Sequence, residues 1–161
     1  METAHTTHSD ADVALRLYDL RREAEMRKAR NWFAGEFWPR SFSELEQLMM
    51  QFGSPQNNWF RQVLSYWDMA AAFVVRGSMH PGLFYDTCGE AWFCYAKVKP
   101  FIQEARTKMN SPEFAANLER TIEGSAEGRE RLQRMQDNIK QFSAMMEKNR
   151  EQWPVSSSEA A

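Results

Sequence analysis

Cysteine, histidine and glycine are scarce in this sequence, and each shortage excludes a class of protein. The 161 residues include 2 cysteines, 3 histidines and 7 glycines. Two cysteines cannot form the dense disulfide framework of a small secreted domain, and so few glycines exclude a collagen-like chain. A chain of this length buries enough apolar surface to fold without a disulfide or a metal ion. We therefore expect Cys88 and Cys94 to be reduced thiols, as in a cytoplasmic protein.

The sequence also lacks an excess of charge of either sign and a long apolar run. The 20 Lys and Arg residues stand against 22 Asp and Glu residues, which gives a net charge of -2. Because bulk attraction to phosphates needs an excess of positive charge, no nucleic-acid partner is expected. The longest strongly apolar run covers residues 69–75, far short of the ~20 residues of a membrane-spanning helix. Residues 1–12 do not have the pattern of a signal peptide, so a cytoplasmic protein without a membrane span is expected.

Aromatic residues and methionines at helical spacing are abundant. The chain has 6 Trp, 4 Tyr, 11 Phe and 10 Met residues, and no segment alternates apolar and polar residues over the length of a strand. This pattern predicts an all-α fold, a helical bundle with a central helical hairpin and long N- and C-terminal helices. One domain is expected over residues 10–153, with disordered tails at 1–9 and 154–161. The helices are expected over about residues 10–37, 41–52, 57–76, 81–99, 101–109, 112–122 and a last segment that ends near residue 152.

The helix expected over residues 57–76 is the centre of this bundle. It carries apolar side chains around most of its circumference, so it needs neighbours on several sides. Asn57 or Asn58 is its expected N-cap, and Gly77 follows it as a left-handed C-cap. In the next helix, Gly89 would let another helix approach closely.

Three carboxylates and two tryptophans form a candidate ligand-binding set. Asp86 and Glu90 are four residues apart on one expected helix, and Asp68 lies at the edge of the apolar arc of the central helix. A cleft that gathered them beside an aromatic cluster could bind a small ligand or carry out acid–base chemistry. Alternatively, Asp68 pairs with an arginine while Asp86 and Glu90 face water. The arginines considered for that pairing are Arg61, Arg76 and Arg106, and the complete candidate set is Asp68, Asp86, Glu90, Trp67 and Trp92.

Signatures of catalysis and of metal binding are missing. No nucleophile, glycine-rich loop or oxyanion motif accompanies the carboxylates, so no catalytic residue is predicted. The histidines are His5, His8 and His80, and the only Glu-x-x-His pattern of the type used by di-iron bundles is Glu2 to His5. We expect no metal and no cofactor.

The last helix carries a candidate interface. Its apolar side chains recur at spacings of three and four over little more than two heptads, so they form either an intermolecular seam or a stripe that packs on the same chain. The residues of this seam are Leu132, Met135, Ile139, Phe142 and Met146. The leading hypothesis is a non-enzymatic interaction or scaffold protein that self-associates through aromatic and Met-rich helix faces, as a homo-oligomer or with a protein partner. The alternative is a small-ligand-binding protein or an enzyme that uses the carboxylates.

A pattern of aromatic and capping positions between residues 59 and 118 resembles the bacterial domain-of-unknown-function 4760 family. Its members are small helical proteins without an assigned activity, so the resemblance implies a helical fold and supplies no functional residues. Many relatives have an N-terminal transmembrane segment, whereas this chain has a charged amphipathic helix there. The positions that carry the resemblance are Tyr66-Trp67-Asp68-Met69-Ala70, Val75-Arg76-Gly77, Leu83-Phe84, Gly89, Trp92, Lys99-Pro100, Ile102, Arg106, Pro112, Phe114 and Leu118.

Overall fold

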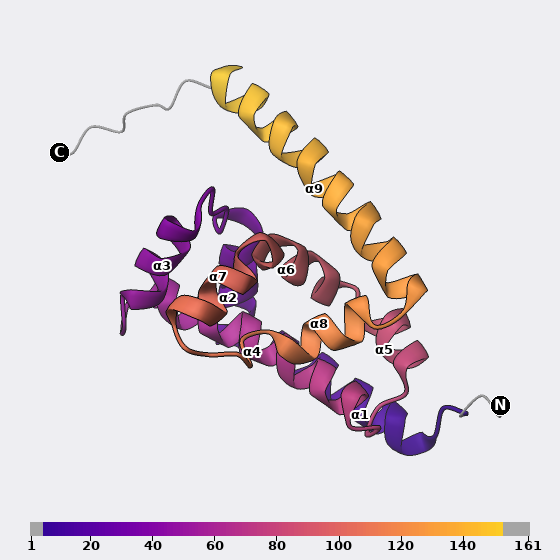
Figure 1. Ribbon diagram of the computed structural model, residues 1–161. Helices are drawn as coiled ribbons and strands as arrows, with labels where there is room; N and C mark the ends of the chain where they lie inside the picture. The colour runs from indigo at the N-terminus through magenta and orange to yellow at the C-terminus, as the bar shows by residue number, and fades with distance from the viewer. Residues whose placement is uncertain (1–4, 153–161) are drawn as a thin grey trace.

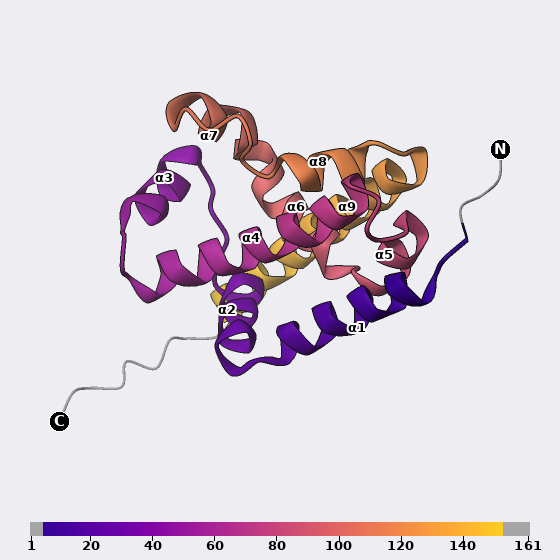
Figure 2. The same cartoon turned by 90° about the horizontal axis from the view of Figure 1, so that it is seen from below.

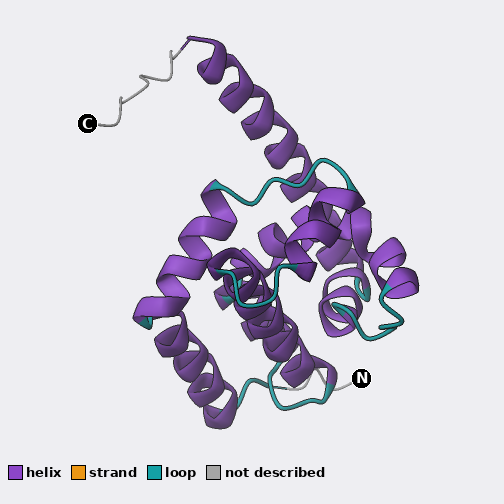
Figure 3. Ribbon diagram, turned by 90° about the vertical axis from the view of Figure 1, so that its left-hand side faces the viewer, coloured by secondary structure: helices purple, strands orange, loops and turns teal. Residues whose placement is uncertain are grey.

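The computed structural model describes the backbone of residues 5–152 and the side chains of residues 5–145. Every regular element in this part of the chain is a helix (Figure 1, Figure 3), which confirms the all-α prediction. The first helix begins at His8, inside the segment expected to be a tail. The elements are α1 (His8–Arg22), α2 (Ala24–Gly35), α3 (Phe42–Met50), α4 (Pro55–Val75), α5 (Pro81–Thr87), α6 (Glu90–Val98), the 3-10 helix η1 (Lys99–Phe101), α7 (Ile102–Lys108), α8 (Ala116–Glu123) and α9 (Ala126–Gln152).

Helix α4 is the centre of the fold, as its apolar circumference predicts. It packs mainly between α2 and α8 and also contacts α3, α5 and α6, an arrangement visible from below in Figure 2. Helix α9 crosses the other side of the molecule against α6 and α8. The core is formed by fully buried side chains from several helices, among them Trp67, Phe60, Val63, Phe33, Trp92, Tyr95, Leu118 and Ile122.

The single N-terminal helix expected over residues 10–37 is in fact two helices, and Glu23 separates them. Its backbone is not helical, with φ -57° and ψ 143°, and its carboxylate accepts hydrogen bonds from the backbone N–H groups of Glu25 and Met26. An acidic side chain that satisfies these free N–H groups stabilises the start of α2. The bend lets α1 contact α5 while α2 packs along α4.

The helix expected over residues 81–99 is also broken, at Cys88 and Gly89. Cys88 ends α5, and Gly89 precedes α6. A Cβ atom at Gly89 would lie 2.8 Å from Nη2 of Arg131 on α9, so the group that lies against this glycine is the end of an arginine side chain and not the backbone of another helix. The Arg131 guanidinium also lies 4.3 Å from the ring centroid of Trp92, which holds α9 against the break.

The N-cap of α4 is Ser54, and the prediction of Asn57 or Asn58 at this position is wrong. Ser54 Oγ accepts from the backbone N–H of Asn57, and Pro55 occupies the first turn. Serine as the cap and proline directly after it is a favoured start, because proline has no N–H to satisfy. Asn57 therefore lies inside the helix, where its side chain is free for another role.

None of the helices within residues 5–152 combines the length and the apolar character that crossing a bilayer would require.

Candidate functional site

Asp68 stabilises the start of a neighbouring helix. Its Oδ1 accepts from the backbone N–H groups of Asn117 and Leu118, each at 3.0 Å, and its Oδ2 accepts from Nδ2 of Asn117 at 2.8 Å. The N-cap residue of α8, Ala115, has no side chain that could accept these bonds. The partner of Asp68 is therefore the N-terminus of α8, where a carboxylate is favoured.

The other members of the candidate ligand-binding set lie apart from Asp68. Glu90 forms a bidentate ion pair with Arg30 of α2, with Nε 2.9 and 3.0 Å from the two carboxylate oxygens, and Asp86 is exposed on α5. Trp67 and Trp92 are fully buried in the core. Asp68 lines a cavity between α3, α4 and the connection from α7 to α8, and none of these four side chains lines it.

The described part of the candidate seam on α9 packs on the same chain. Leu132 is buried, and Met135 and Ile139 are half-buried against the core. Phe142 is 43% exposed, and its ring centroid lies 6.0 Å from that of Trp38. The side chain of Met146 lies outside the described residues.

The cysteine and histidine side chains do not form a reactive group in the described part of the chain. Cys88 and Cys94 are free and buried, and desolvation raises the pKa of both thiols. Nδ1 of His80 accepts from the backbone N–H of Gly82 at the start of α5. Among the described residues, no three His, Cys, Asp or Glu side chains gather in a way that could hold a metal ion.

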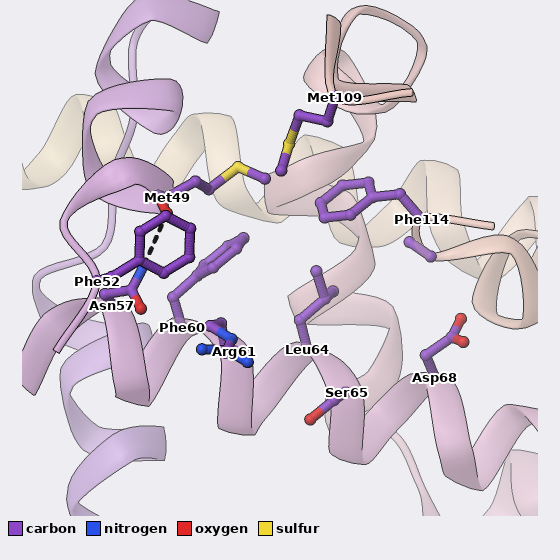
Figure 4. Close-up of a pocket in the computed structure, with 11 residues that line it drawn as sticks. Met49, Phe52, Asn57, Phe60, Arg61, Leu64, Ser65, Asp68, Met109 and Phe114 are labelled. Atoms are coloured by element: carbon purple, nitrogen blue, oxygen red, sulfur yellow. Dashed lines mark hydrogen bonds between the residues drawn. The ribbon is translucent and has the colours of Figure 1, made fainter. Parts of the chain in front are cut away.

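A cavity of 380 Å³ lies between α3, α4 and the connection from α7 to α8 (Figure 4). This size is within the range of ligand sites, about 300–1,000 Å³. Its lining is mostly apolar, with Arg61, Ser65 and Asp68 along one side. The apolar lining residues are Met49, Phe52, Phe60, Leu64, Met109, Phe114 and Ala115.

One buried polar atom at this cavity has no partner. Asn57 is fully buried and lines the cavity. Its Nδ2 donates to the carbonyl oxygens of Leu48 and Met49, each at 3.0 Å, and so satisfies the end of α3. Its Oδ1 accepts no hydrogen bond from the described residues. A buried acceptor without a partner costs free energy. Because Oδ1 is itself buried, this cost falls on the fold, and a group in the cavity does not reach the atom without a rearrangement.

Large apolar side chains also lie exposed around this cavity. Phe52 is 73% exposed, Met50 is 62% exposed and Met109 is 40% exposed. Phe52 and Met109 line the cavity, and Met50 is the last residue of α3, next in sequence to the lining residue Met49. We call the cavity together with these three side chains the Met/Phe groove. The sequence does not reveal this groove, because Gly53-Ser54-Pro55 indicates where a helix stops but not which side chains before it stay exposed.

The comparisons with known proteins give a family and no activity. No curated protein and no solved structure matches the chain. The model of a domain of unknown function, DUF4760, matches residues 6–125. The match extends on both sides of residues 59–118, where the resemblance is seen in the sequence, and includes α1 to α8 but not α9. Because the match covers most of the chain, this protein belongs to the DUF4760 family.

Proposed function

We propose that this protein is a non-enzymatic interaction protein that self-associates, and that two copies join through their Met/Phe grooves. The observation that carries the proposal is a large, exposed apolar side chain in the lining of an apolar cavity: Phe52 is 73% exposed and lines a cavity of 380 Å³. A closed two-fold dimer requires one patch to fit itself. In such a dimer, Phe52 of each copy would enter the cavity of the other.

A second copy covers this surface better than a small ligand would. A ligand inside the cavity leaves the outer parts of Phe52 and Met109 exposed, whereas a facing protein surface covers these side chains and also fills the cavity. Methionine side chains adapt their shape to a partner, and Met49 and Met109 line the cavity. Burying one phenylalanine contributes about 1.5–3 kcal/mol, and a two-fold dimer buries two.

The seam on α9 is not the surface used in this proposal. Leu132 is buried and Met135 and Ile139 are half-buried against the core of their own chain, so each of them exposes a smaller fraction of its surface than Phe52 does. The proposal therefore assigns self-association to the Met/Phe groove and not to the seam. Like the seam, the groove is rich in aromatic and methionine side chains.

The two cysteine thiols of the chain are in the state expected for a protein in a reducing compartment. Cys88 and Cys94 are buried and free, as is usual for cytoplasmic proteins. We propose a cytoplasmic location on this basis, and fractionation of cells that express the protein, with detection in the soluble cytoplasmic fraction, tests it.

Light scattering on purified protein tests the self-association. The wild type is expected to have twice the mass of one chain at 100 µM, and Phe52→Glu is expected to have the mass of one chain with unchanged helicity. Leu15→Glu is the matched control, because Leu15 is 63% exposed on α1, away from the groove. A monomeric wild type, or a Phe52→Glu variant that keeps the wild-type mass, contradicts the proposal.

A further inference from the structure

The side chain of Lys97 on α6 is buried, and no carboxylate among the described side chains forms an ion pair with it. It is 6% exposed, and its Nζ donates a hydrogen bond to the backbone oxygen of Phe33 at 2.6 Å. The ion pairs of the described residues do not include this Nζ. An ammonium group has three N–H donors, so two remain for another acceptor.

Aromatic rings surround the Lys97 Nζ. It lies 3.6 Å from the ring centroid of Trp38, and the centroids of Phe93, Phe33 and Phe37 follow at 5.0, 5.3 and 5.5 Å. Ring faces attract a cation but do not replace a charged acceptor. Desolvation lowers the pKa of Lys97 to about 7, so the group changes its protonation near neutral pH.

Lys97 lines a second cavity, of 540 Å³, between the connection from α2 to α3, the end of α6 and α9. Its volume is again within the range of small-molecule sites. The apolar lining residues are Trp38, Pro39, Ala96, Pro100, Phe101, Ile139 and Phe142. Apart from Lys97, the charged residues in its described lining are Glu36 and Arg40, both exposed. Cys94 is on α6, three residues before Lys97, and burial raises the pKa of its thiol, so the thiol is neutral.

We propose that this second cavity binds an amphipathic monocarboxylate. The carboxylate accepts hydrogen bonds from Lys97 Nζ and supplies the negative charge that this buried cation lacks. The apolar body of the ligand packs against the rings of Trp38 and Phe101 and against Ile139. Arg40 attracts an anion to the cavity, while Glu36 repels a second carboxylate and so favours ligands with one acidic group. This site is separate from the Met/Phe groove, and neither proposal depends on the other.

Calorimetric titration with decanoate tests the inference, with decanol as the neutral probe of the same chain length. Decanoate is expected to bind the wild-type protein at least about tenfold more tightly than decanol, since a hydrogen bond to a charged group is lost with decanol. In Lys97→Met, which keeps an unbranched apolar stem, the two probes are expected to bind equally. Equal affinity of decanoate and decanol for the wild type, or no binding of decanoate at millimolar concentration, overturns the proposal.

Proton uptake gives a second readout that needs no variant. A bound carboxylate raises the pKa of Lys97, so binding near pH 8 takes up a proton and the affinity for decanoate falls as the pH rises from 6 to 9. Titrations in two buffers of different ionisation enthalpy measure this uptake. The role of Lys97 is contradicted if the heat of decanoate binding is the same in both buffers and the affinity does not change with pH.

Discussion

Asp68 and Asn117 are joined by two hydrogen bonds that connect the central helix to the start of α8. One comes from the backbone N–H of Asn117 at 3.0 Å and the other from its side-chain amide at 2.8 Å, and Leu118 adds a third bond to the same carboxylate. The sequence led us to consider Asp68 as a ligand-binding residue, whereas its observed contacts are those of a helix cap supplied by a different helix.

Removing this cap is expected to destabilise the fold. Asp68→Ala leaves two backbone N–H groups of α8 without their acceptor, which costs about 1–3 kcal/mol of the free energy of unfolding. Asp68→Asn keeps one acceptor oxygen and is expected to lose less. Urea denaturation measures both variants, with Asp86→Ala as the control because Asp86 is exposed. Equal stability of Asp68→Ala and Asp86→Ala would show that the cap contributes nothing.

Burial of Lys97 predicts a specific pH dependence of stability. Its pKa is about 7 in the folded protein and about 10.4 in the unfolded chain. The unfolded state therefore binds more protons between these values, so this group makes the free energy of unfolding rise with pH from 7 to 9. The expected gain is on the order of 2 kcal/mol, and it is fully absent from Lys97→Met.

Denaturation of the wild type and of Lys97→Met at pH 7, 8 and 9 measures this difference. The variant also provides the control for every other titrating group. If the two proteins show the same pH dependence, Lys97 titrates in the folded state as an ordinary exposed lysine does.

Packing of α9 on its own chain predicts that its apolar residues contribute to stability and not to association. Leu132→Ala removes a buried side chain and is expected to cost about 2–5 kcal/mol. Phe142→Ala is expected to cost less, because Phe142 is 43% exposed. Neither variant should change the molecular mass. Denaturation and light scattering on the same samples measure both properties, and a loss of mass in Leu132→Ala would mean that α9 joins two chains.

Helical periodicity predicted the regular elements well where burial follows one face. The spacing of Leu132, Met135 and Ile139 placed them on one face of α9 but left open whether that face packs on the same chain or on another one. The apolar circumference around Trp67 identified α4 as the central helix. The 3.6-residue period determines which side chains share a face, but not which chain covers that face.

The helix ends were harder to predict, because they depend on single residues whose types are favourable at more than one position of a helix. Glu23 fits the interior of a helix as well as its start, and only the packing of α1 on α5 and of α2 on α4 selects the second. Asn57 is a good N-cap by residue type, but Ser54 with Pro55 takes that position.

The two candidate sites could not be predicted from the sequence, because each depends on segments that are distant in the chain. Phe52 belongs to a groove only because the connection from α7 to α8 lies opposite it. Lys97 is buried only because Phe33, Trp38 and Phe142 come together around α6 and α9. A lysine in an amphipathic helix is ordinarily expected on the solvated face.

An experiment that mixes two variants tests most directly whether Phe52 of each copy enters the cavity of the other. Phe52→Glu removes the inserted side chain, which is also one part of the cavity lining, and leaves Phe60, Leu64 and Phe114 of that lining in place. Ser65→Trp blocks the cavity from an exposed position on its lining but keeps Phe52. A mixed dimer of these variants retains one intact contact, in which Phe52 of one copy enters the cavity of the other, whereas neither variant alone retains any. Light scattering is expected to give the mass of one chain for each variant alone and the mass of two chains for an equimolar mixture. A mixture that stays monomeric, or a variant that is dimeric alone, contradicts self-association through the Met/Phe groove.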